Sequence, residues 1–306
     1  HLSIRRQRQM CIRDRGYITD LSYGASQYQR IRTEGMVYAV ETKTGEATSV
    51  YVNPTDGSYK FINLKAGTYQ LTASAGLYKS TGYAYANTTL PYKVTVNEGV
   101  NLTNINIPLN RGCKLGGILR YLDAGSSQPI RAIAGNPWLR AAGITLLNYS
   151  VEAYDSKGRL MGTYNASFRY LSAEDATASP FTIIGTKYAG LDVGTYQLRP
   201  CVFGYVSRTQ TIFTAALPGN TYSNIYIDLH TGGIISGTIT FVDPSGNYET
   251  PYSASQKTGV SYGGNVAVNV FDSSGTLRGS YIRKWTDDQS TTLKFYVLGF
   301  SDYYNK

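Results

Sequence analysis

The sequence predicts an all-β protein made of tandem two-sheet sandwiches, and three observations support this fold class. The pentapeptide Gly-Thr-Tyr-Gln-Leu occurs twice, at 67–71 and at 194–198. In both copies apolar residues alternate with polar ones, as expected of a strand with one buried face. The 306 residues include 32 glycines and 28 tyrosines, a composition that suits strands and tight turns better than helices.

A second pattern marks where the repeats begin and end. The segments 35–41, 117–123 and 237–243 share a glycine, two spaced apolar residues and a final acid, and 104–112 matches 224–232. Unequal spacing between matching ends is typical of one fold whose loops differ in length. We therefore expect the three glycine-led segments to be equivalent strands.

Two hairpins are also predicted. The segment Val151–Tyr164 returns as Val268–Tyr281, and each copy has Asp-Ser-x-Gly at its centre. Aspartate can accept hydrogen bonds from the backbone just after it, and glycine tolerates the positive φ that the turn requires. The alternative, a calcium loop at Asp155 or Asp272, lacks enough oxygen donors at close spacing.

The first repeat resembles a known family. The stretch Thr55–Leu71, followed by Gly76-Leu77-Tyr78, is similar to the carboxypeptidase regulatory-like domain. The resemblance implies a seven-stranded, transthyretin-like (prealbumin-like) sandwich of immunoglobulin-like architecture. The second repeat keeps 191–198 but has Ser179-Pro180-Phe181 where the family has Asp-Gly. The family includes surface spacers, accessory domains of secreted peptidases and carbohydrate-binding modules, so the resemblance specifies fold better than function.

These patterns predict the domain boundaries. We expect a sandwich over 25–111, a second one with long loop insertions over 112–231, and a truncated third over 232–306. Residues 17–24 are interpreted as the end of a preceding repeat, because Asp20-Leu21 matches Asp228-Leu229. Residues 1–16 resemble a translated sequencing adapter and are expected to pack on nothing. The alternative for their five arginines is a basic arm that binds nucleic acid or anionic lipid.

The alternation also predicts which residues form the cores. The first core is expected to contain Val37, Val40, Tyr59, Phe61, Tyr69, Leu71, Ile105 and Ile107. The second is expected to contain Leu119, Val151, Phe181, Ile183, Tyr196, Leu198, Ile225 and Ile227.

The charge of the chain offers little support for a nucleic-acid partner. There are 29 basic and 20 acidic residues, a net charge of +9. Without residues 1–16 the balance is 24 to 19, and the remaining basic residues are scattered along the sequence. No run of eighteen apolar residues is present, so no membrane span is predicted in this segment.

Catalytic and metal-binding patterns are also missing from the sequence. The two histidines, His1 and His230, cannot assemble a zinc site by themselves. No nucleophile elbow or phosphate loop occurs. The acidic pairs Glu174-Asp175 and Asp287-Asp288 lie in polar sequence and are interpreted as solvated turns. We therefore predict no catalytic residue, no cofactor and no metal.

Some residues remain as candidates for binding or modification. An insertion at 128–142 carries Trp138 and Arg140, which with Tyr149 form the candidate ligand site; the alternative is a loop anchored by its own Trp138. The candidate glycosylation acceptors are Asn87, Asn101, Asn148 and Asn165. Cys113 and Cys201 are the candidate disulfide pair.

Together these features predict a non-enzymatic, extracellular surface protein in which tandem sandwiches act as a spacer or adhesive array. Its expected partners are the neighbouring repeats of the same chain, and surface polysaccharide or other cell-surface proteins. The alternative is a set of carbohydrate-binding accessory domains of a secreted enzyme. Exposed aromatic residues clustered on one face would favour the alternative, whereas aromatic residues within the cores would favour the spacer.

Overall fold

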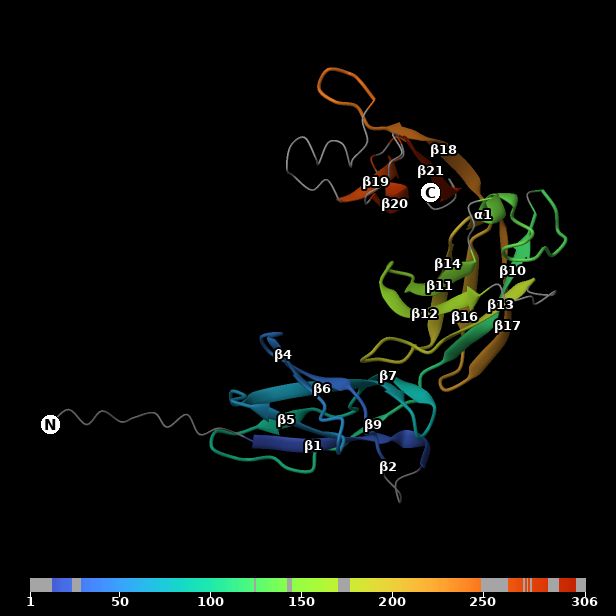
Figure 1. The fold of residues 1–306 in the computed structure, drawn as a ribbon. Coiled ribbons are helices and arrows are strands. Elements are labelled where there is room, and N and C mark those ends of the chain that lie inside the picture. The colour runs from blue at the N-terminus through green and yellow to red at the C-terminus, as the bar shows by residue number, and fades with distance from the viewer. Residues whose placement is uncertain are drawn as a thin grey trace.

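The computed structural model describes residues 13–23, 29–123, 125–141, 145–169, 177–248, 264–271, 273, 275, 277–285 and 292–300. Nearly all regular structure in these ranges is β-strand, as predicted. The helical elements are the short α1 (Pro137–Ala141) and the single 3-10 turn η1 (Leu21–Tyr23). Three groups of strands follow one another along a curved path (Figure 1). None of the described helices is long and apolar enough to cross a membrane.

The first sandwich consists of two facing sheets. One sheet has the order β4-β3-β6-β7, with β8 added beside β6, and the other has the order β2-β1-β5, with β9 beside β1. The strands are β1 (Arg13–Asp20), β2 (Gln29–Arg30), β3 (Gly35–Glu41), β4 (Ala47–Tyr51), β5 (Ser58–Ile62), β6 (Gly67–Tyr78), β7 (Tyr83–Thr89), β8 (Val94–Val96) and β9 (Ile107–Leu109).

Strand β1 corrects the expected start of this sandwich. It pairs antiparallel with β5, from Arg13 opposite Ile62 onward, and parallel with β9. The expectation that residues 1–16 pack on nothing is therefore wrong for 13–16, and 17–20 belong to the first sandwich, not to a preceding repeat. Residues 1–12 lie outside the described part. The sequence match between 20–24 and 228–232 gave this wrong prediction, because it involved few residues and did not show which strands would be neighbours.

The second sandwich repeats this arrangement with longer loops. Its strands join in the order β12-β11-β14-β15-β17-β10-β13, with β16 beside β14. The strands are β10 (Lys114–Leu122), β11 (Leu146–Asp155), β12 (Leu160–Arg169), β13 (Ala178–Ile183), β14 (Gly194–Val202), β15 (Tyr205–Ser207), β16 (Thr211–Ala215) and β17 (Thr221–Thr231).

The two Gly-Thr-Tyr-Gln-Leu segments occupy equivalent strands, β6 and β14. Tyr69 lies opposite Glu41 of β3, and Tyr196 lies opposite Asp155 of β11. Each tyrosine hydroxyl donates to the carbonyl four residues before it, Tyr69 to Lys65 at 3.0 Å and Tyr196 to Asp192 at 2.7 Å. The repeat predicted from the pentapeptide is confirmed.

The glycine-led pattern was only partly right. Strand β10 pairs antiparallel with β13 and parallel with β17, and in the first sandwich the strand with those neighbours is β1, not β3. The true counterpart of Gly117 is therefore Gly16. A Cβ on either glycine would lie 1.9 Å from a carbonyl oxygen, that of Ile225 or Ile105, so only glycine fits.

The predicted cores are confirmed with two differences. Val40 is 37% exposed, because it lies an odd number of positions from the buried Val37 and so faces the other side of β3. Ile105 is only partly buried and packs against the edge of the core. The other predicted residues are buried in two separate clusters, one per sandwich.

The third group contains β18 (Gly233–Thr240), β19 (Gly264–Phe271), β20 (Leu277–Trp285) and β21 (Thr292–Phe300). Strand β18 pairs with β21, with Gly237 opposite Phe295, as Gly117 is opposite Phe181. The predicted hairpin is confirmed in β19 and β20, which match β11 and β12. Among the described residues of this group no strand corresponds to β6 or β14.

Candidate functional site

The first two sandwiches meet in a joint that is held by backbone hydrogen bonds. The linker 110–113 runs between β7 and the loop 184–193 that connects β13 to β14. Gly112 N donates to Ala84 O at 2.8 Å, and Ala86 N donates to Asn110 O at 3.0 Å. From the second sandwich, Gly190 N donates to Tyr85 O at 2.8 Å. The linker is thus ordered as part of a ladder and does not act as a flexible tether.

Two glycines show how closely the backbones approach in this joint. A Cβ on Gly76 would lie 2.0 Å from Lys187 O, and one on Gly190 would lie 2.8 Å from the carbonyl carbon of Ala84. Neither distance is compatible with a side chain. Gly76 belongs to the first sandwich and Lys187 to the second, so the absence of a side chain at Gly76 serves contact between sandwiches.

Side chains around the ladder add further contacts. Lys187 forms an ion pair with Glu34 at 3.1 Å, and the rings of Tyr51 and Tyr188 lie 5.7 Å apart. Asp192 accepts a hydrogen bond from the backbone N of Asn87 at 3.1 Å. Burial raises the pKa of the Asp192 carboxyl, and the bonds from Asn87 offset this only in part. The exposed ion pair contributes little to stability, so backbone contact and shape define the joint.

A buried carboxylate fixes the linker from inside the first sandwich. The Asp20 side chain is fully buried at the end of β1. Its Oδ2 accepts from Arg111 Nη2 at 3.0 Å and from the Tyr85 hydroxyl at 2.8 Å. Its Oδ1 accepts from the Ser22 backbone N at 2.9 Å. Arg111 also lies over the ring of Tyr83, 4.8 Å from its centre.

The electrostatics of this network favour the ionised carboxylate. Burial alone would raise the pKa of Asp20, but the hydrogen bonds from Ser22, Tyr85 and Arg111 together outweigh it and lower the pKa. Burial raises the pKa of the Tyr85 hydroxyl, and its bond to Asp20 raises it further, so tyrosine remains a donor. Asp20 and Arg111 were not predicted to interact. The sequence places Asp20 two positions after Ile18, on the same face of a strand, but nothing local indicates its distant partner.

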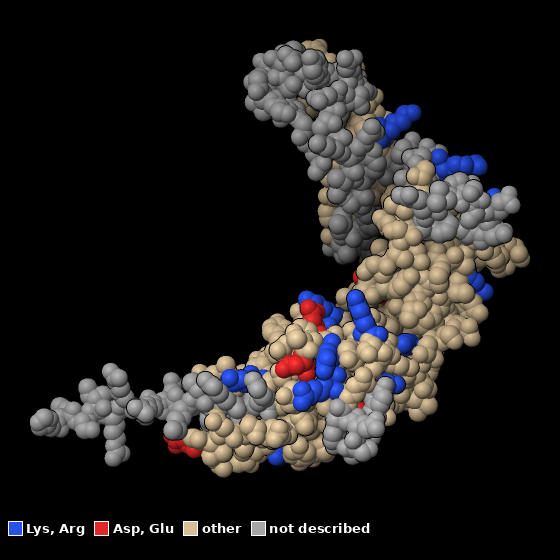
Figure 2. Space-filling model, turned by 60° about the horizontal axis from the view of Figure 1, so that its bottom comes forward, with Lys and Arg blue, Asp and Glu red and all other residues tan. Residues whose placement is uncertain are grey.

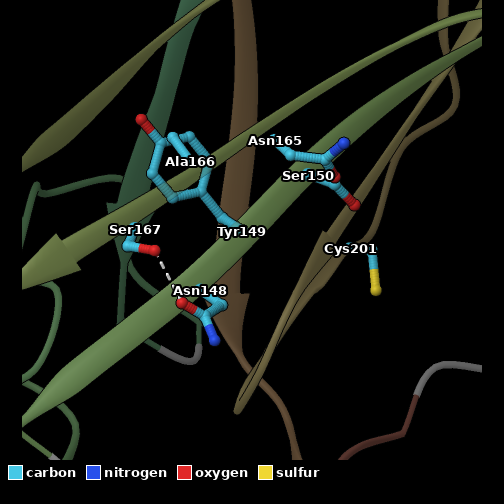
Figure 3. A pocket seen from close by; sticks show the side chains of 7 residues that line it. All are labelled: Asn148, Tyr149, Ser150, Asn165, Ala166, Ser167 and Cys201. Atoms are coloured by element: carbon cyan, nitrogen blue, oxygen red, sulfur yellow. Dashed lines mark hydrogen bonds between the residues drawn. The ribbon is translucent and has the colours of Figure 1, made fainter.

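A hollow lies on the outer face of the second sandwich, where β12, β11 and β14 run side by side (Figure 3). Its volume is about 370 Å³, and none of its lining side chains is charged. Ser167 Oγ donates to Asn148 Oδ1 at 2.8 Å across the two strands. The lining residues are Asn148, Tyr149, Ser150, Asn165, Ala166, Ser167 and Cys201.

The predicted ligand site does not assemble. Trp138 is 44% exposed on α1, whereas Tyr149 is buried in the core and donates to Pro180 O at 2.9 Å. Arg140 is exposed on α1. The loop is not anchored by Trp138 either. Its anchors are Leu139, which is fully buried, and Asn136, whose amide donates to Gly204 O at 3.1 Å.

The candidate glycosylation sites and the two candidate cysteines lie in different parts of the structure. Asn87 lies in the joint, Asn101 is exposed, and Asn148 and Asn165 line the hollow. The predicted disulfide is wrong, because both cysteines are free thiols. Cys113 is buried and its thiol donates to Leu217 O at 3.3 Å, and Cys201 is exposed on β14. The two thiols therefore lie in different environments, one buried at the linker and one exposed on β14.

Within the described ranges no three His, Cys, Asp or Glu side chains come together as a metal site would require. The turn at Asp155 is a plain hairpin, since its Oδ1 accepts from the backbone N of both Lys157 and Arg159 at 2.9 Å. Glu174-Asp175 and Asp287-Asp288 lie outside the described residues. On the face shown in Figure 2, basic groups are dispersed and acidic groups lie among them.

No protein-family model and no curated protein matches the chain, so its resemblance to the carboxypeptidase regulatory-like domain stays a prediction. Among solved structures it is similar to a streptococcal ancillary pilin, at 10% identity over 94% of this chain and 87% of that chain, with a TM-score of 0.26. The shaft pilin SpaA from Lactobacillus rhamnosus GG aligns at 10% identity over 74% and 99%, with a TM-score of 0.28. A DUF3823 family protein from Bacteroides uniformis aligns at 10% identity over 68% and 97%, with a TM-score of 0.23. These low values identify neither the family nor the function of the chain.

Proposed function

We propose that this chain is a non-enzymatic structural segment of an extracellular surface protein, in which tandem sandwiches hold neighbouring parts at a fixed distance and orientation. One observation carries the proposal: the linker 110–113 is built into a backbone ladder that spans both sandwiches. A flexible tether would leave these backbone groups to water, and orientation between the sandwiches would then vary.

The chemistry of the joint supports a mechanical role. Burying the Asp20 carboxylate costs free energy, which its five hydrogen bonds, four of them side chain to side chain, offset. The network links the first strand of the first sandwich to the residue at the centre of the linker. Bending at the linker would separate Arg111 from Asp20 and leave a buried charge unpaired. The joint therefore resists bending.

The proposal is tested by a variant that changes the joint but neither core. Gly190→Val places a branched side chain against Ala84, which forces the two backbones apart. Spin labels on the two sandwiches of the full chain should report one narrow distance distribution in the parent and a broad one in Gly190→Val. Gly116→Ala is the matched control, because its Cβ would meet its nearest atom at an ordinary 3.5 Å.

A broad distribution in the parent chain would contradict a spacer. So would a narrow, unchanged distribution in Gly190→Val, since the joint would then not set the orientation. The alternative, a carbohydrate-binding array centred on Trp138, draws no support from the arrangement of Trp138, Arg140 and Tyr149. Glycan-array binding that disappears in Trp138→Ala would restore it.

A further inference from the structure

The joint between the first two sandwiches has two sides. One side is a protruding loop, called the donor, and the other is the surface that receives it, called the acceptor. The donor is the loop that follows β13 of the second sandwich, with Lys187 and Tyr188 at its tip. The acceptor is the outer face of β4, β3 and β6 of the first sandwich, where Glu34, Tyr51 and Gly76 meet that loop. Because the sandwiches repeat, the positions of this acceptor can be located on the second sandwich.

The equivalent positions on the second sandwich line the hollow. Strand registers place Met36 opposite Tyr51 and Ser74, and they place Ser150 opposite Asn165 and Cys201. Because Tyr69 and Tyr196 are equivalent, their partners Glu41 and Asp155 are equivalent, and so are Met36 and Ser150 five positions earlier. Tyr51 therefore corresponds to Asn165. Two residues before Met36 is Glu34, and two before Ser150 is Asn148, so these residues correspond as well. The hollow is the acceptor face of the second sandwich.

The equivalent donor belongs to the third group of strands. Phe181 of β13 and Phe295 of β21 each lie opposite a matching glycine of their partner strand, Gly117 of β10 or Gly237 of β18. Four residues after each phenylalanine comes a glycine, Gly185 or Gly299. A tyrosine then follows in both sequences: Tyr188 is the seventh residue after Phe181, and Tyr303 is the eighth after Phe295.

The described contacts bring this donor strand to the correct side of the second sandwich. Strand β21 contacts β15, which pairs with β14, the strand that carries Cys201. In the first joint the donor loop likewise contacts β7, the counterpart of β15, through Gly190 and Tyr85. Ile234 of β18 packs against the second core, which keeps the third group close.

We propose that the hollow on the second sandwich is the seat for the segment of this chain that follows β21, so that every joint of the array uses one docking rule. The inference rests on the proposed spacer function and adds to it a repeating geometry. The two seats differ in size. Phe203 stands where the first sandwich has Gly76, so the second seat cannot admit a backbone as closely and instead leaves a hollow of about 370 Å³. Asn148, Ser150 and Asn165 offer neutral hydrogen-bonding groups to the incoming segment.

Cys201 provides a natural probe of this seat, because it lies in the hollow and is a free, exposed thiol. In the full chain carrying Cys11→Ser, cysteine is introduced in turn by Asp302→Cys, Tyr303→Cys and Tyr304→Cys. Under mild oxidation at least one of them should form an intramolecular disulfide with Cys201 about tenfold faster than Ser273→Cys, because docking raises the local thiol concentration. Ser273 is exposed at the turn between β19 and β20.

Three results would overturn the inference. The first is an equal rate of disulfide formation for all four variants, and the second is a disulfide only between two copies of the chain. The third is protection of Cys201 from a thiol-labelling reagent by a neutral oligosaccharide such as cellohexaose. The last two would identify another occupant. A reference pair, Tyr51→Cys with Tyr188→Cys in a Cys11→Ser/Cys201→Ser background, separates the two proposals. If the reference pair bridges and Cys201 does not, the spacer stands and the docking rule fails. If the reference pair does not bridge, the spacer fails.

Discussion

The exit of a sandwich, the point where the chain leaves its last strand, lies near Arg111 in the first sandwich and near Thr231 in the second. The two exits occupy the same place in the fold but are stabilised by different interactions. At the first exit Asp20, Tyr85 and Arg111 form a buried charged network. Registers show that the same three positions at the second exit are Tyr121, Tyr205 and Thr231. There the rings of Tyr121 and Tyr205 pack edge to face, 4.9 Å apart between centres.

The difference separates what the fold requires from what the joint requires. Both exits keep a tyrosine that pairs with the linker backbone, so this residue belongs to the shared architecture. The second exit satisfies its tyrosines locally, since the Tyr121 hydroxyl meets Ser179 Oγ at 2.8 Å and Tyr205 donates to Ala132 O. Only the first exit directs a buried charge at the linker. An ion pair there has directional geometry, which an apolar contact lacks.

The largest expected effect tests whether the two sandwiches share one architecture. Tyr69→Ala and Tyr196→Ala should each lower the free energy of unfolding of their sandwich by about 3–5 kcal/mol, because each ring is buried in an equivalent core. Urea denaturation, followed by hydrogen exchange to assign the sandwich, measures both. Tyr196→Phe is the control, and it should cost only about 1 kcal/mol, the value of the bond to Asp192 O. Losses that differ severalfold between the two alanine variants would argue against equivalence.

The next effect tests the charged exit itself. Asp20→Asn should destabilise the first sandwich by about 3 kcal/mol, because it leaves Arg111 without its buried partner. It should also broaden the distance distribution across the joint. Asp228→Asn is the matched control, since its ion pair with Arg120 is solvent-accessible, unlike the fully buried Asp20, and should contribute about 1 kcal/mol or less. Equal losses from the two variants would show that burial of Asp20 does not matter.

Acid should distinguish the two exits. The folded pKa of Asp20 lies below its ordinary value of 3.8, so its contribution to stability is complete above that pH and is lost as the pH falls further. The first sandwich should therefore weaken below about pH 4 more steeply than its Asp20→Asn variant. Thermal unfolding at pH 2.5 to 6, with assignment by hydrogen exchange, provides the comparison. If the thermal stabilities of parent and variant changed with pH in parallel, the lowered pKa of Asp20 would be contradicted.

The smallest effect concerns the second exit. Thr231 Oγ1 is buried and has no hydrogen-bond partner among the described residues. Thr231→Val replaces this hydroxyl by a methyl group of similar shape, so the second sandwich should be unchanged or gain up to about 1 kcal/mol. Calorimetry of parent and variant measures the difference. A loss of stability would show that the hydroxyl is satisfied and that the second exit is also polar.

The sequence by itself determined the strand class, the repeat and most of both cores. Alternation reports which face of a strand is buried, and a repeated pentapeptide marks equivalent strands, since both are local properties of the chain. The same reasoning placed Val40 inside the core, where a strand's period of two excludes it. It also matched Gly35 to Gly117, because a short glycine pattern does not show which strands will be neighbours.

Only the tertiary structure decided where the first sandwich begins and what joins it to the second. Arg13–Asp20 became a strand because β5 and β9 offer it backbone partners 40 to 90 residues away in the chain. Asp20 and Arg111 are 91 residues apart, and Gly76 is glycine because of Lys187 in another sandwich. Such contacts depend on packing between distant segments, and no local pattern in the sequence encodes them.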